Sequence, residues 1–308
     1  MEKSYLAFVE KLRQELIRVA GVEDTSVFFK RKEEYLQTDE DRLYLFLGEK
    51  DGKKVGCGIY TQDLYNNTEP DTDLGEIVDT VLTRVYHMRQ LPFLENIRKE
   101  ADYEEIRSSL FIRLLNYQKN KNELNGVVYE RIGDIALVLY QKLGEQENTV
   151  ISVKIRESML AQWHQDKKNV MENAMQNTCY LMPPRFYVWD RLLEDPDYGG
   201  EKFMEFQSNC QLYKGCLGNC LSTTVKTNGA VAVFFPGVME KIAGLIGSGF
   251  YMVFTSVHEV MIHNDQTSDP DRLKLILRDT IEKATLPREI LTYQIYHYDK
   301  DTGRITWE

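Results

Sequence analysis

The sequence has no run of apolar residues long enough to cross a membrane. The longest candidate, Gly229–Phe235, has the length of a strand, whereas a membrane span needs about 20 apolar residues. The segment Met1–Ala20 also lacks the apolar core of a signal peptide, because charged residues such as Glu2, Lys3 and Glu10 are spread through it. We therefore expect a protein that is not exported, does not cross a membrane and stays in the cytoplasm.

Cysteine is scarce and its count is odd. The chain has five cysteines in 308 residues, and a chain of this length folds without disulfides. Cys210, Cys216 and Cys220 are the candidate metal ligands, but only the second of their two spacings suits a zinc site, and His164 or Cys179 would have to complete the set. A disulfide is a further alternative. We expect free thiols, no bound metal and no cofactor.

Several motifs of enzyme chemistry are also missing. The sequence has no Gly-x-x-x-x-Gly-Lys or Gly-x-Gly-x-x-Gly loop to hold phosphate groups, and no Gly-x-Ser-x-Gly turn to present a nucleophile. His258 and His263 are five positions apart, whereas a zincin helix needs a spacing of four to place both imidazoles on one face. Nucleotide-dependent enzymes of these types and zinc proteases are therefore not predicted.

Positive charge is in deficit, because 38 Lys and Arg stand against 48 Asp and Glu and give a net charge of −10. This balance disfavours binding to nucleic acid or to an anionic membrane. The composition is 43% hydrophobic, which is enough for a sizeable core. Eighteen tyrosines supply amphipathic rings that suit protein recognition.

The hydrophobic pattern predicts an α+β protein of two packed units, with mostly antiparallel sheets flanked by amphipathic helices. The first unit covers residues 1–95. It is expected to contain a helix up to Gly21, three strands and a second helix, at 1–20, 25–29, 43–47, 55–60 and 71–88.

The second unit covers residues 96–308 and includes an irregular loop at about 190–220, where glycine recurs and periodicity is weak. Helices are predicted from apolar residues at three- and four-residue steps, at 102–117, 158–178, 236–246 and 269–284. Strands are predicted at 135–140, 149–153, 230–235, 251–254 and 259–262, with a closing hairpin of 290–298 and 304–307.

A small polar group is the only candidate catalytic site. Ser256 and His258 are two residues apart and would share one face of a strand, while Glu259 would face the opposite side. Asn177 and Thr178 are candidate binding residues that folding would have to bring near this group. The alternative interpretation is structural, with these side chains bonded to neighbouring backbone groups.

Several short motifs follow one another along the chain in a characteristic order. They are Ile59-Tyr60 with Asp63-Leu64-Tyr65, Leu114–Tyr117, Asn177-Thr178, Pro183-Pro184, Asn228–Ala230, Pro236–Val238, Ser256–Val260 and Ile295–Asp299. On these residues the chain resembles an uncharacterised bacterial family, a domain of unknown function common in anaerobic Gram-positive gut bacteria and often encoded on mobile elements. The resemblance implies a fold and no reaction.

Two functions from different classes remain open. The first is a non-catalytic cytoplasmic protein that binds or regulates a protein partner, as an accessory factor of a mobile element. Missing catalytic motifs and an acidic composition favour this hypothesis. The alternative is a hydrolase of unknown substrate that uses Ser256, His258 and Glu259.

Overall fold

The computed structural model describes residues 2–31, 41–50, 53–68, 72–90, 102–146, 149–188, 191, 194–195, 197–206, 208–213 and 218–308. The chain divides into two compact units, Met1–Glu100 and Ala101–Glu308. Every strand pairing across these ranges is antiparallel and helices accompany the sheets, which confirms the predicted α+β class. None of the described helices is long and apolar enough to cross a bilayer.

The first unit is a three-stranded sheet with order β1-β2-β3 and helices packed on it. Its elements are α1 (Glu2–Ala20), β1 (Val27–Lys30), β2 (Arg42–Lys50), β3 (Lys53–Tyr60), α2 (Thr61–Asn67) and α3 (Leu74–Gln90). The stripe of Val9, Leu12 and Leu16 on α1 is buried against the sheet, as its spacing predicts. Gly21 ends α1 with a φ of 62°, a left-handed conformation that glycine adopts without strain.

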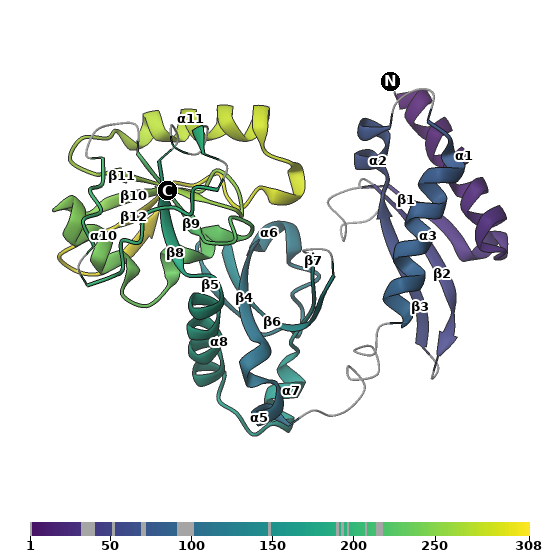
Figure 1. Ribbon diagram of the computed structural model, residues 1–308, viewed down its shortest axis with the longest axis horizontal. Helices are drawn as coiled ribbons and strands as arrows, with labels where there is room; N and C mark the ends of the chain where they lie inside the picture. Colours follow the sequence, from purple (N-terminus) through teal and green to yellow (C-terminus); the bar gives the residue numbers. More distant parts are fainter. Residues whose placement is uncertain are drawn as a thin grey trace. The chain divides into compact units, whose positions relative to one another are not determined.

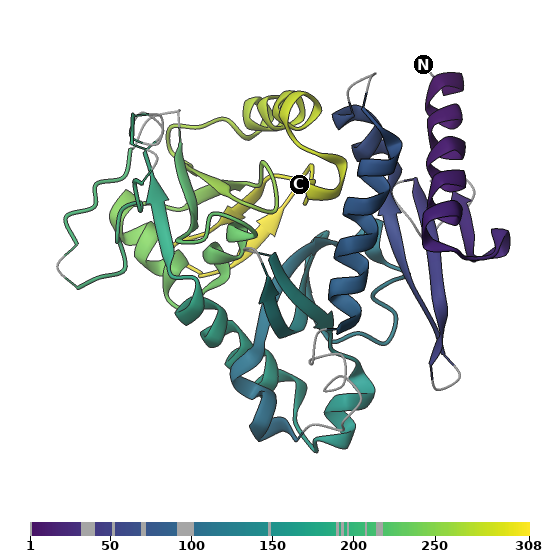
Figure 2. The ribbon, with the colours of Figure 1, turned by 45° about the vertical axis from the view of Figure 1, so that its right-hand side comes forward.

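The second unit contains two sheets (Figure 1). In the four-stranded sheet β6 is central, because it pairs with three neighbours. The elements of this part are α5 (Tyr103–Ile106), β4 (Leu110–Asn116), α6 (Tyr117–Asn120), β5 (Tyr129–Ile132), β6 (Ile135–Gln146), β7 (Thr149–Lys154), α7 (Glu157–Gln162) and α8 (Lys167–Leu181). Helix α8 lies along β4 (Figure 2). Apolar side chains of α8 and β4 belong to the largest hydrophobic core of the second unit.

The six-stranded sheet has order β13-β12-β10-β11-β9-β8. Its strands and helices are β8 (Pro184–Tyr187), β9 (Asn219–Thr223), the 3₁₀ helix η3 (Gly229–Phe234), α10 (Val238–Ile246), β10 (Phe250–Val253), β11 (Val260–Asn264), α11 (Pro270–Ala284), β12 (Tyr296–Tyr298) and β13 (Ile305–Trp307). Alternate residues of β10 face opposite sides. Phe250 packs with α10, whereas Val253 packs with α11, so the two helices cover opposite faces of the sheet.

The predicted helix at 102–117 is wrong over most of its length. Tyr103–Ile106 is α-helical and Tyr117 begins α6, but Arg107–Ser109 forms a 3₁₀ turn and Leu110–Asn116 is strand β4. Most of β4 is buried, with apolar side chains on both faces. Because both faces must be apolar, the sequence pattern loses its alternation and resembles a helical stripe.

Three further predicted elements differ from the structure. In the closing hairpin, only Tyr296–Tyr298 of the predicted strand 290–298 is a strand, and it pairs with Ile305–Trp307. The helix at 158–178 is two helices, α7 and α8, separated by a turn in which His164 has a φ of 52°. The strand at 230–235 is instead the 3₁₀ helix η3, whose first five residues are buried. A short apolar run surrounded by core does not reveal its conformation through periodicity, which explains this error.

Candidate functional site

An apolar pocket of about 660 Å³ lies in the second unit. We call it the methionine pocket. It is lined by Glu130 and Ile132 of β5, Leu137 of β6, Lys168, Met171, Glu172, Met175 and Gln176 of α8, Phe234 and Pro236 around η3, Met239 of α10 and Ile305 of β13. Its volume falls within the range of ligand-binding pockets.

The floor of the methionine pocket belongs to the hydrophobic core of the second unit. Met171 is buried, while Met175, Phe234, Met239 and Ile305 are only partly buried and pack against that core. Methionine is unbranched and polarizable, so a surface rich in methionine adapts to differently shaped apolar groups. The pocket therefore offers an adaptable apolar surface that the rest of the second unit leaves open.

Polar side chains form the rim of this pocket. Glu130, Lys168, Glu172 and Gln176 are exposed. Lys168 and Glu172 form an ion pair with a distance of 3.9 Å between Nζ and Oε1, and exposed pairs of this kind add little stability. The arrangement of an apolar centre with a charged rim is typical of protein interfaces.

Ser256, His258 and Glu259 lie in the turn between β10 and β11, so the expectation that they are strand residues is wrong. The Ser256 hydroxyl donates to Oε1 of Glu259 at 2.8 Å and accepts the backbone N–H of His258 at 3.0 Å. Thr255 also donates its hydroxyl to Glu259. The carboxylate therefore holds the turn together as an acceptor of two hydroxyl groups.

The imidazole of His258 faces a different set of partners. Its Nδ1 accepts the backbone N–H of Asn228 at 3.0 Å, and its Nε2 lies 3.5 Å from Oε1 of Glu289. The backbone carbonyl of His258 accepts the Ser222 hydroxyl at 2.7 Å. The imidazole thus joins the turn to the segment before η3, while the Ser256 hydroxyl bonds to Glu259.

The candidate binding residues Asn177 and Thr178 attach α8 to the four-stranded sheet. The Asn177 amide donates to the carbonyls of Arg107 and Leu110 at 2.6 and 3.1 Å. The buried Thr178 hydroxyl donates to a carbonyl one turn back in α8 and accepts the Ile112 N–H at 2.9 Å. These bonds go to the segment before β4 and to β4 itself, so both residues have structural partners.

The candidate metal ligands are in different environments. Cys220 is buried in strand β9 and not in the irregular loop, and burial raises the pKa of its thiol to about 12, with a further increase from Glu259. Cys210 is partly buried, and burial also raises its pKa. Cys216 lies outside the described residues. Across the described ranges, no three His, Cys, Asp or Glu side chains gather as metal ligands.

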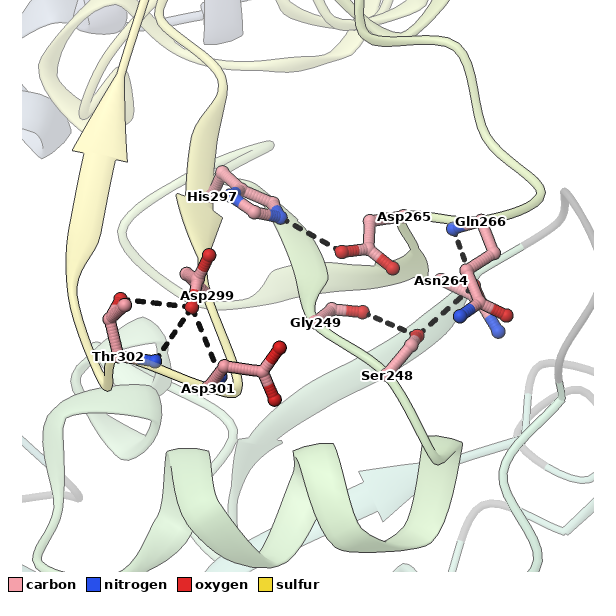
Figure 3. Close-up of polar contacts among 9 residues, drawn as sticks. All are labelled: Ser248, Gly249, Asn264, Asp265, Gln266, His297, Asp299, Asp301 and Thr302. Carbon is pink, nitrogen blue, oxygen red and sulfur yellow. Dashed lines mark hydrogen bonds and ion pairs between the residues drawn. The ribbon is translucent and has the colours of Figure 1, made fainter.

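A second, polar cavity of about 490 Å³ lies where the α10–β10 connection, the end of β11 and the β12–β13 hairpin meet. Figure 3 shows polar contacts of several residues in and around it. Nε2 of His297 lies 3.0 Å from Oδ2 of Asp265, and the ring of Tyr251 packs on the imidazole with centroids 5.0 Å apart. Burial, followed by the negative charge of Asp265, raises the pKa of Tyr251.

Asp299 belongs to the hairpin side of the same cavity. Its Oδ1 accepts the N–H groups of Asp301 and Thr302 at 3.0 and 2.7 Å, and the Thr302 hydroxyl at 2.9 Å (Figure 3). These bonds hold the pKa of Asp299 below its ordinary value, the Thr302 N–H being the largest cause. Its carboxylate is therefore a turn-forming group that keeps the hairpin closed.

Sequence reasoning did not select the lining of either cavity. One signal was present, because Ile295–Asp299 is among the motifs that carry the family resemblance and contains His297 and Asp299. The spacing of Met171 and Met175 also marks one face of a helix. Nothing in the sequence joins these positions to Glu130 or Ile305, which tertiary folding alone brings to one pocket.

The fold and cavities define an α+β protein with an apolar pocket and a separate polar cavity in its second unit. The chain belongs to a family of unknown function, DUF5688, whose family model matches residues 5–300. This confirms the resemblance to a family without a known activity. No curated protein and no solved structure matches the chain.

Proposed function

We propose that this protein is a non-catalytic binding protein that acts by protein–protein interaction through the methionine pocket. One observation carries the proposal: an open pocket of about 660 Å³ combines an apolar, methionine-rich centre with a charged rim. Partly buried Met175, Phe234 and Met239 would become fully buried when a partner side chain enters. Removing such apolar area from water is the main favourable contribution to protein association.

The bonds of the polar candidate residues support the same proposal. Asn177 and Thr178 fasten α8 to the sheet, and the Ser256 hydroxyl bonds to Glu259. In a serine–histidine couple the imidazole accepts the proton of the serine hydroxyl. In this turn the imidazole Nδ1 instead accepts a backbone N–H. A binding role therefore has more geometric support than a catalytic one.

The test is affinity purification of the full chain from its native host, in parallel with two variants. Met175→Lys places a charge in the pocket, while Leu275→Lys makes the same change at an exposed position of α11. A partner recovered by wild type and Leu275→Lys, but lost with Met175→Lys, should be purified and its binding reproduced with the two isolated proteins. A partner that binds Met175→Lys as well as wild type would refute the pocket as the binding site.

The alternative proposal is a hydrolase centred on Ser256, His258 and Glu259. The observation in its favour is that all three residues lie in one turn, with the carboxylate of Glu289 3.5 Å from the imidazole Nε2. Ser256→Ala should abolish hydrolysis of a responsive substrate from an ester and amide panel, while leaving binding at the methionine pocket intact. Unchanged turnover in Ser256→Ala would exclude this serine as the nucleophile.

We also propose that the protein acts in the cytoplasm of a bacterium, as an accessory factor of a mobile element. The free thiols of Cys57, Cys179, Cys210 and Cys220 fit a reducing compartment. Fractionation of the native host tests the compartment, and inspection of neighbouring genes tests the association with a mobile element. Recovery of the protein outside the cytoplasm, or genes unrelated to mobility beside it, would contradict the respective part.

A further inference from the structure

We infer that the methionine pocket takes the apolar face of an amphipathic helix of the partner, and that basic side chains flank that face. The inference rests on the proposed function, because it names the chemistry of the partner that would bind this pocket. Three features of the pocket carry it: the shape of its α8 side, the chemistry of its centre and the charge of its rim.

The α8 side of the pocket has the form of a helix-packing surface. Its lining residues recur at steps of three, one, three and one along the helix, at Lys168, Met171, Glu172, Met175 and Gln176. Residues at this spacing form one stripe along a helix. With a rise of about 1.5 Å per residue, the stripe is roughly 12 Å long. A second helix can place its own row of side chains along such a stripe.

The centre of the pocket suits apolar anchors more than polar ones. Met171 and Met175 come from α8, and Met239 comes from α10, so flexible thioether side chains from two helices line it. Phe234 and Ile305 add rigid apolar surface. Amphipathic helices that bind grooves of this kind insert apolar side chains spaced three or four residues apart.

The charged side chains of the rim are two glutamates and one lysine, so the rim carries a net negative charge and favours positive charge on the partner. Glu130 is exposed and forms no ion pair with any residue in the described ranges. Glu172 has only the 3.9 Å pair with Lys168, in which both side chains are exposed. The whole chain carries a net charge of −10, which attracts basic partners and speeds their association. Lysine or arginine beside the anchors would pair with the two glutamates.

The probes are two synthetic amphipathic peptides with leucine at the same helical positions, one with lysine and one with glutamate at the flanking positions. A third peptide has the leucine–lysine composition in scrambled order. Binding of each labelled peptide to the full chain is measured by fluorescence anisotropy. We expect the leucine–lysine peptide to bind at least about tenfold more tightly than the other two, because it alone combines the apolar row with the favourable charge.

Variants assign this binding to the pocket. Met175→Lys should weaken binding of the leucine–lysine peptide by at least about tenfold, while Leu275→Lys on α11 should leave it within about twofold. The two variants change the net charge equally, so a general electrostatic effect would act on both. The double variant Glu130→Lys, Glu172→Lys alters only exposed side chains and should reverse the preference toward the leucine–glutamate peptide. Circular dichroism checks that each variant is folded.

Two outcomes would overturn the inference. If the lysine and glutamate peptides bind equally well and Met175→Lys weakens both, the partner helix does not need basic side chains. The pocket would then remain an interaction site. Binding of the leucine–lysine peptide to Met175→Lys and Leu275→Lys with the same affinity would show that this helix does not use the pocket. The proposed function fails separately, when the purified native partner binds Met175→Lys as tightly as wild type.

Discussion

His297 and Asp265 are joined by a contact of 3.0 Å between Nε2 and Oδ2, and the residue that makes room for it is Gly249. A Cβ at position 249 would lie 2.5 Å from that carboxylate oxygen and 3.2 Å from the imidazole Nε2. It would also lie 2.7 Å from the carbonyl oxygen of Tyr298. A backbone atom on one side and a bonded pair on the other leave no direction in which a methyl group fits.

Gly249→Ala should therefore destabilise the protein, by about 1–3 kcal/mol in the free energy of unfolding, which is the usual cost of overpacking. Gly244→Ala is the matched control, because a Cβ there meets nothing within 4 Å and the residue lies inside α10. That control should be stabilising by roughly 0.5–1 kcal/mol. Denaturant unfolding of both variants measures the difference. Equal stability of the two variants would contradict the steric argument.

Asp299 should make stability depend on pH in acid. Its pKa is lowered in the folded protein, so its contribution is complete above the ordinary aspartate value of 3.8 and is lost as pH falls through the lower folded value. Melting temperatures of wild type and Asp299→Ala should thus differ at neutral pH and converge on acidification. If the difference in melting temperature stays constant as the pH falls to the folded pKa of Asp299, the charge of this carboxylate contributes nothing to stability.

Much of the fold could be predicted from the sequence, where one face of an element is buried and the other is exposed. The stripe of α1 is of this kind, and so is Tyr296–Tyr298 of the closing hairpin. The errors lie where both faces are buried. Leu110, Ile112 and Leu114 of β4 face one side of the strand and Phe111 the other, so the apolar run also satisfies helical spacing.

The sites were less accessible to sequence reasoning, because their residues are distant in the chain. Ser256 and Glu259 are close in sequence and do bond to each other. The hydrolase hypothesis requires folding to bring Asn177 or Thr178 near them, whereas the Asn177 amide bonds to Arg107 before β4 and to Leu110 at the start of β4. The methionine pocket joins positions from Glu130 to Ile305, and no local pattern specifies which apolar side chains remain partly exposed after folding.

Cys220 should not hold a zinc ion together with Cys210. A zinc site needs ligands that converge on one point, whereas Cys220 is buried in β9 and no three His, Cys, Asp or Glu side chains gather as metal ligands in the part of the chain that the structure describes. Metal analysis of the purified protein should find no stoichiometric zinc. A thiol reagent at neutral pH should modify Cys220 only after denaturation. Stoichiometric zinc that disappears in Cys220→Ser would refute the prediction.

Glu259 should behave as a structural acceptor. Glu259→Ala leaves the hydroxyls of Thr255 and Ser256 without their acceptor, at an expected cost of about 1–3 kcal/mol. Glu259→Gln should cost less, because the amide keeps one acceptor oxygen. Chemical denaturation of both variants measures these costs. If Glu259→Gln instead preserves stability but abolishes a hydrolytic activity found for the wild type, the carboxylate is catalytic.

Thr178 is expected to be the most sensitive of the candidate binding residues, for a structural reason. Its fully buried hydroxyl accepts the Ile112 N–H and donates to the Ala174 carbonyl, so it joins α8 to β4. Thr178→Val keeps the shape but leaves a buried N–H without an acceptor, which should cost about 1–3 kcal/mol. Thr80→Val is the control, because the exposed Thr80 hydroxyl only donates to the Glu76 carbonyl one turn back. Thermal and denaturant unfolding should show a clear loss for the first variant and little change for the second. A stable Thr178→Val that has lost binding to a partner would instead make Thr178 part of an interaction surface.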